Sequence, residues 1–184
     1  MRIIGGQNKR RRIKVSKKGI RPTKGIIRGA IFNIIRDKVH NACILDIFAG
    51  SGSLGLEAIS RGAKSCVFIE KRPKILFQNI EDFSVADKTR VITGDFRVGL
   101  TKIGGMQFDI IFMDPPYYKN YVEKTLTLIT KHHLLRKEGV IVAEHYCDEE
   151  FALPNSLFIF KQKRYHKTAV SFIVKNGANE SSNT

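Results

Sequence analysis

An aspartate, two prolines and a tyrosine follow the apolar run Phe108–Met113. Proline has a fixed φ and no N–H, and it pushes the preceding residue toward extended backbone. The stretch therefore offers two acceptors, the carboxylate of Asp114 and the carbonyl of Pro115, and few donors. Two acceptors suit the N–H groups of an exocyclic base amine, whose lone pair they would orient and whose developing positive charge they would stabilise. Tyr117 adds an aromatic face for an unstacked base.

Asp-Pro alone would indicate only a turn that ends a strand. The full tetrapeptide after an apolar strand, with a glycine-rich loop earlier in the chain, favours chemistry. We therefore predict that the catalytic residues are Asp114, Pro115 and Tyr117.

The glycine-rich loop follows an earlier apolar run. Gly50, Gly52 and Gly55 satisfy the pattern G-x-G-x-x-G, and Glu70 ends the next apolar run. That arrangement fits a dinucleotide site, in which the carboxylate holds ribose hydroxyls. However, Asp46 stands just before the loop, where a carboxylate disfavours pyrophosphate and suits a cationic ligand. S-adenosylmethionine (AdoMet) has a sulfonium, an ammonium and no phosphate, so we expect it as the cofactor.

Gly94-Asp95-Phe96 closes a third apolar run, where a carboxylate and a ring suit an adenine. Asp after Gly is also typical of a turn or a helix cap. The predicted cofactor-binding residues are Asp46, Phe48, Gly50, Gly52, Glu70, Asp95 and Phe96.

We expect no metal site, because the three cysteines are too widely spaced for zinc, and we interpret them as reduced thiols.

The elements that would position these residues alternate along the chain. Apolar runs predict strands over 43–48, 66–70, around 91–92, 108–113 and 139–144. Helical spacing predicts helices over 24–37, 53–61 and 73–85, a short one ending near 100, and one from 121 to about 134. Repeated strand–helix units indicate an α/β fold with a parallel sheet, whose ligands bind beyond the carboxyl ends of the strands. Residues 157–163 and 168–175 predict a closing antiparallel hairpin.

The chain of 184 residues suits one domain with a small appendage. We divide it into a basic, hairpin-like N-terminal arm (1–22), a main domain (23–175) and a frayed tail (176–184). No apolar run reaches the length of a membrane span, and no apolar segment of a signal peptide follows the N-terminus. We therefore expect a cytoplasmic protein without membrane contact, and a monomer.

The net charge of +15 is concentrated at the two ends of the chain. Residues 1–36 contain 12 Lys or Arg and no acid. Such a distribution indicates a polyanionic partner, although a solvated tail that aids solubility remains an alternative. The predicted RNA-binding residues are Lys9, Arg10, Arg11, Arg12, Lys14 and Arg21.

Residues 46–63 together with Asp114–Tyr117 resemble class I AdoMet-dependent amino-methyltransferases. The resemblance narrows to the bacterial 16S rRNA guanine-N2 methyltransferases of the small-subunit methyltransferase D family. It rests on Met1–Gly6, Arg21-Pro22-Thr23, Arg28, Phe32-Asn33 and the hairpin Tyr165–Phe172. One departure is Lys24-Gly25, where this family usually has an acid.

The resemblance implies a Rossmann-like, seven-stranded methyltransferase sheet that methylates a guanine N2 of 16S rRNA within the small ribosomal subunit. It also implies that Asp46, Gly50 and Gly52 line the methionine part of the cofactor, that Glu70 holds the ribose, and that Asp95 and Phe96 hold the adenine. Two other functions stay open: a DNA adenine-N6 methyltransferase, which usually needs an additional recognition domain, and a non-catalytic RNA-binding or ribosome-assembly protein.

Overall fold

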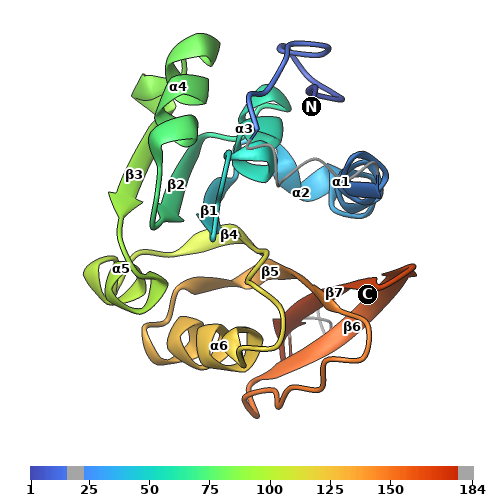
Figure 1. The fold of residues 1–184 in the computed structure, drawn as a ribbon. Helices are drawn as coiled ribbons and strands as arrows, with labels where there is room; N and C mark the ends of the chain where they lie inside the picture. Colours follow the sequence, from blue (N-terminus) through green and yellow to red (C-terminus); the bar gives the residue numbers. More distant parts are fainter. Residues whose placement is uncertain (16–22, 178–184) are drawn as a thin grey trace, which may run out of the picture.

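The computed structural model describes residues 1–15 and 23–177, which form a seven-stranded sheet covered by helices (Figure 1). The strand order is β3-β2-β1-β4-β5-β7-β6. β7 is antiparallel to both of its neighbours, and the other pairs are parallel. The bounds are Cys43–Ile47 (β1), Ser65–Glu70 (β2), Thr89–Thr93 (β3), Phe108–Met113 (β4), Leu135–Tyr146 (β5), Leu157–Tyr165 (β6) and Thr168–Lys175 (β7). The α/β class, the mainly parallel sheet and the closing hairpin are thus confirmed.

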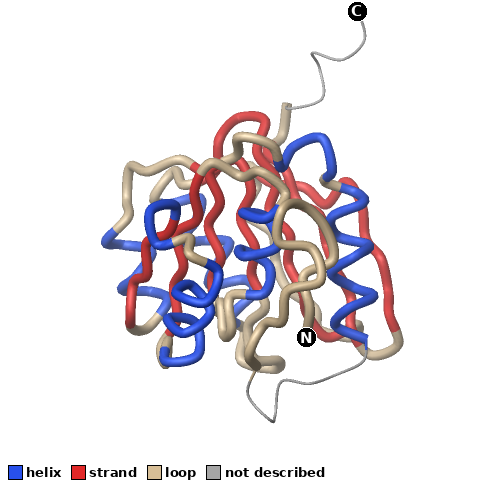
Figure 2. Tube along the Cα trace, turned by 90° about the horizontal axis from the view of Figure 1, so that it is seen from above, coloured by secondary structure: helices blue, strands red, loops and turns tan. Residues whose placement is uncertain are grey.

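Helices lie on both sides of the sheet, as the view from above shows (Figure 2). α1, α2, α3 and α4 pack against one face, and α5 and α6 pack against the other. Alternate side chains of a strand serve opposite faces, as in β4, where Ile110 and Phe112 join one core and Ile111 and Met113 the other. The bounds are Thr23–Ile34 (α1), Arg36–Val39 (α2), Ser53–Ser60 (α3), Lys74–Phe83 (α4), Ala86–Lys88 (the 3₁₀ helix η2), Phe96–Lys102 (α5) and Tyr121–Lys131 (α6).

The clearest differences from the predicted elements concern one helix and one strand. The helix predicted over 24–37 is interrupted at Ile35, so that α1 and the short α2 are separate. The strand predicted over 139–144 begins four residues earlier, at Leu135. Its first half contains the exposed charged residues Arg136 to Glu138, so an apolar run does not mark this part of the strand.

The N-terminal arm is hairpin-like, as predicted, and residues 1–15 of it pack on the main domain. Arg2 and Arg12 form an antiparallel bridge. Ile3 and Ile13 are buried in the same core cluster as residues of α1 and α3. Arg21, predicted to bind RNA, lies outside the described residues, as does the tail from residue 178.

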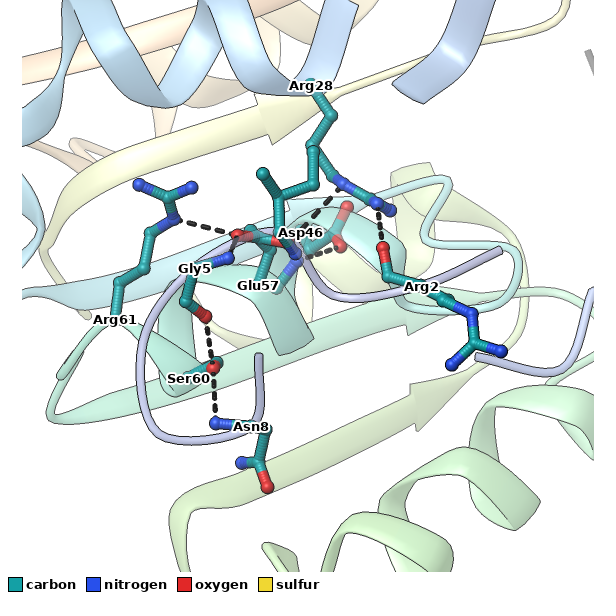
Figure 3. A network of polar contacts seen from close by, with 10 residues as sticks. Arg2, Gly5, Asn8, Arg28, Asp46, Glu57, Ser60 and Arg61 are labelled. Carbon is teal, nitrogen blue, oxygen red and sulfur yellow. Dashed lines mark hydrogen bonds and ion pairs between the residues drawn. The ribbon is translucent and has the colours of Figure 1, made fainter. Parts of the chain in front are cut away.

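A buried glutamate anchors the arm (Figure 3). The fully buried carboxylate of Glu57, on α3, accepts hydrogen bonds of 2.8 Å from the backbone N–H groups of Ile4 and Gly5. The carboxylate also accepts a hydrogen bond of 2.8 Å from Nε of Arg61. Its Oε2 lies 3.5 Å from Nε of Arg28, a buried residue of α1. One side chain therefore connects the arm with two helices.

We predict that Glu57→Gln lowers the free energy of unfolding by about 3–5 kcal/mol, because it leaves Arg28 buried without its counter-charge. The amide would also place N–H groups against backbone donors that need an acceptor. Urea unfolding measures the change, and limited trypsin digestion reports release of the arm.

Glu81→Gln is the matched control, because Glu81 is an exposed residue of α4. We expect it to shift stability by less than about 0.5 kcal/mol. Equal stability of the Glu57→Gln and wild-type proteins, with an equally resistant arm, would contradict the anchoring role.

Candidate functional site

A cleft opens beyond the carboxyl ends of the parallel strands, where the sequence predicts the ligands. It has two adjoining parts of about 550 and 460 Å³. Four residues line both parts, which makes them halves of one cleft: Lys24, Phe48, Glu70 and Asp114. Among the other predicted site residues, Asp46 and Gly50 line the smaller part, whereas Asp95, Phe96, Pro115 and Tyr117 line the larger part.

Gly52 is the predicted cofactor residue that does not line the cleft. It is buried in a left-handed conformation (φ 77°) just before α3, where a Cβ would lie 2.5 Å from the side chain of Leu76. Its absent side chain thus allows the turn and the close packing of α4. The role of Gly52 is therefore structural: it shapes the loop and forms no part of the wall of the cleft.

Two carboxylates hold the glycine loop from either side. Asp46, at the end of β1, accepts the Gly55 N–H at 2.9 Å. Glu70, at the end of β2, accepts the N–H groups of Gly50 at 2.7 Å and Arg72 at 2.9 Å. The Gly50 N–H, which could otherwise bind a phosphate, therefore bonds a carboxylate. This arrangement is unfavourable for a pyrophosphate and compatible with a cation.

Asp46 is a buried acid with 3% exposure. Burial raises the pKa of Asp46 to about 7; the hydrogen bond from Gly55 opposes the rise, and the charges of Asp114 and Glu70 add to it. A positive ligand beside this group would favour its ionised form. The smaller part of the cleft thus combines a buried acid with the acidic ends of neighbouring strands.

Aromatic rings form one wall of the larger part. Phe96 lies 4.8 Å from Phe48 and 5.1 Å from Tyr121 between ring centroids, and Phe48 stacks on Tyr121 at 6.0 Å. Sequence analysis missed Tyr121, because it lies on α6 and no local pattern links it to the loop after β1. Flat apolar rings of this kind suit the face of an aromatic ligand.

Asp95 caps α5, which was the alternative interpretation of Gly94-Asp95-Phe96. It accepts the N–H of Arg97 at 3.0 Å and binds the Arg97 guanidinium through two contacts of 2.8 and 3.0 Å. The side-chain hydrogen bond from Arg97 is the main cause that lowers the pKa of Asp95. Asp95 also lines the cleft, so capping and ligand binding are compatible here.

The tetrapeptide closes β4 at the mouth of the cleft. Asp114 forms an ion pair with Lys24, whose Nζ lies 2.9 Å from Oδ2. The hydroxyl of Tyr117 lies 3.1 Å from Oγ1 of Thr168, which ties the tetrapeptide to β7. Tyr118, with 68% exposure, packs its ring 5.0 Å from that of Tyr146 and extends the aromatic surface beyond Tyr117.

Lys24 is a second residue that sequence analysis missed as part of the site. In the sequence, Lys24 stands out only as a departure from the family's pattern. It is 90 residues from Asp114 in the chain, so no local pattern could pair the two.

The basic residues of the arm are not equivalent. Lys14 pairs with Asp82 at 2.7 Å. Arg11 donates to the carbonyl of Asp82 and lies over the ring of Phe83. All five described residues of the predicted RNA-binding set are exposed, and the contacts of Lys14 and Arg11 distinguish these two from Lys9, Arg10 and Arg12.

Within residues 1–15 and 23–177, no group of three or more His, Cys, Asp or Glu side chains is arranged to hold a metal ion. Across the same residues, none of the helices has the length and apolar character to cross a membrane.

Comparisons with known proteins agree with this geometry. The family model described as "Conserved hypothetical protein 95" matches residues 1–174. Ribosomal RNA small subunit methyltransferase D of Escherichia coli (strain K12) is 35% identical over 147 residues, which cover 78% of this chain and 74% of that protein. The protein of the same name from Haemophilus influenzae is 30% identical, with coverage of 89% and 88%. The chain belongs to this methyltransferase family.

A solved structure from Escherichia coli with the name "Putative methyltransferase yhhF" superposes with a TM-score of 0.87 at 30% identity, over 95% of this chain and 97% of that one. The resemblance to the methyltransferase D family and the Rossmann-like methyltransferase fold, both expected from sequence, are therefore confirmed.

We predict that Asp46→Asn makes the protein more stable at pH 8, by up to about 4 kcal/mol, and that the gain disappears near pH 4. An acid whose pKa is raised by folding costs stability as the pH rises from its unfolded value toward its folded value. The amide keeps an oxygen for the Gly55 N–H and has no charge to bury. Urea unfolding at several pH values measures the difference.

Asp87→Asn, at an exposed position of η2, should show no such pH dependence. A stability difference between the Asp46→Asn and wild-type proteins that is constant from pH 4 to 8 would refute the raised pKa.

Proposed function

We propose that this protein transfers a methyl group from AdoMet to the exocyclic N2 amine of a guanine in 16S rRNA. The observation that carries the proposal is the position of Asp114 and Pro115 at the end of β4, where both parts of the cleft meet. The relatives named ribosomal RNA small subunit methyltransferase D support the class of substrate.

The residues of the cleft fit AdoMet better than a dinucleotide. Asp46 and Glu70 present negative charge where the positive methionine part would lie, and the Gly50 N–H is already bonded to Glu70. Phe48 and Phe96 would contact the adenine, with Asp95 at its edge. When bound, AdoMet supplies an activated methyl group on its sulfonium.

The tetrapeptide would hold the target base for this reaction. Oxygens of Asp114 and Pro115 accept the two N–H groups of the amine, so its lone pair is directed toward the methyl donor and positive charge on nitrogen is stabilised. Asp114 then accepts the proton, directly or through water. Tyr117 stacks on the base that has left its helix.

The decisive experiment is methyl transfer to small ribosomal subunits and to duplex DNA, followed by mass spectrometry of the product nucleosides. We expect N2-methylguanosine in the 16S rRNA. N6-methyladenine in the DNA would instead support the adenine methyltransferase, and tight AdoMet binding without any transfer would support the non-catalytic RNA-binding protein.

We predict that Asp114→Asn lowers kcat by at least about a hundredfold, because the amide has no negative charge and is a weak proton acceptor. AdoMet affinity, measured by calorimetry, should change less than about threefold. Asp109→Asn is the control, since Asp109 lies near the start of β4 and pairs with Arg136 there. Full activity of Asp114→Asn would sink the proposed role.

We predict that replacing Lys9, Arg10 and Arg12 by Ala weakens binding to 16S rRNA and flattens its dependence on salt. Each lost phosphate contact would reduce the slope of log K against log salt concentration by about 0.7 to 0.9. Lys14→Ala should change the slope less, because Lys14 already pairs with Asp82. Identical slopes for the triple variant and the wild type would contradict RNA binding by the arm.

We further propose that the protein acts as a monomer in the cytoplasm. The exposed arm would then contact the rRNA while the cleft receives the target base. Light scattering of the purified protein measures the oligomeric state.

A further inference from the structure

The ion pair at the mouth of the cleft joins two distant parts of the chain. Lys24 lies in the first turn of α1 and Asp114 follows β4. Their Nζ–Oδ2 distance is 2.9 Å, and the side chains have exposures of 32% and 28%. The contact uses Oδ2, so Oδ1 is the carboxylate oxygen left for a target amine.

Lys24 is placed among acidic groups. Burial lowers the pKa of Lys24, but the charge of Asp114 and the hydrogen bond to it, with the charges of Glu144 and Tyr117, outweigh this effect and raise the pKa overall. Asp46 and Glu70 also line the cleft next to Lys24. The ammonium therefore opposes the mutual repulsion of carboxylates at neighbouring strand ends.

We infer that Lys24 is a positioning residue for Asp114: its ammonium holds Oδ2 in place, while Oδ1 receives the N–H of the target amine. The inference rests on the proposed function. Ion pairs with this degree of exposure contribute little to stability. Loss of Lys24 should therefore be visible in the reaction and much less in folding.

The experiment compares Lys24→Met, Lys24→Arg and the wild type in methyl transfer to small ribosomal subunits. We expect Lys24→Met to lower kcat by roughly tenfold or more, because the carboxylate is then no longer held in one orientation. Lys24→Arg should recover most of the activity, since it keeps the charge. AdoMet affinity and the midpoint of thermal unfolding should stay near those of the wild type.

The control is Lys38→Met, which removes a lysine whose Nζ caps the carbonyl of Glu138, away from the cleft. We expect wild-type kcat for this variant. A second measurement does not depend on activity: NMR titration of Lys24 should show a lower pKa in Asp114→Asn than in the wild type.

Three results would overturn the inference. They are wild-type kinetics of Lys24→Met, a gain of activity in that variant, or a pKa of Lys24 that is the same in Asp114→Asn as in the wild type. A gain would mean that the lysine only blocks the carboxylate. Failure of the proposed function is a separate result, because the wild-type protein itself would then leave the rRNA unmethylated.

Discussion

The parallel register of β1 and β4 determines where the candidate site of this protein is located. Ile47 pairs with Met113, and Ile47 also pairs with Ile69 of β2. The residues that follow these positions are Phe48, Asp114 and Glu70, so groups from three strands reach one edge of the sheet. Because parallel strands end on the same side, this register gathers acids that are far apart in the chain.

The carboxylates gathered at this edge repel one another, and nearby groups of the protein compensate for part of that repulsion. The chain as a whole is strongly basic, but Asp46, Glu70 and Asp114 line the same part of the cleft. Backbone N–H groups of the glycine loop neutralise part of this charge, and Lys24 pairs with Asp114. A cationic ligand would complete the compensation, which gives the proposed choice of cofactor a physical reason.

The arm shows a related use of buried charge. Glu57 accepts hydrogen bonds from two backbone N–H groups of the arm, and it pairs with Arg28 of α1 and with Arg61, which caps the C-terminus of α3 (Figure 3). The arm is thereby packed on the domain along residues 1–15, while Lys9, Arg10 and Arg12 remain exposed. A prearranged basic surface loses less conformational entropy on binding a polyanion than a free tail would.

Much of this architecture could be predicted from local patterns. Apolar runs, glycines and caps indicated the strands and the turns after them, because these signals lie within a few neighbouring residues. The charged first half of β5 was not predicted, since an exposed strand segment has no apolar pattern. The break between α1 and α2 at Ile35 was not predicted either. Local sequence was enough to establish the α/β class, the glycine loop and the tetrapeptide at a strand end. The pairing of Lys24 with Asp114, the place of Tyr121 in the aromatic wall and the anchoring of the arm by Glu57 became apparent only in the folded molecule. These contacts join residues that are far apart in the chain and that strand order and helix packing bring together.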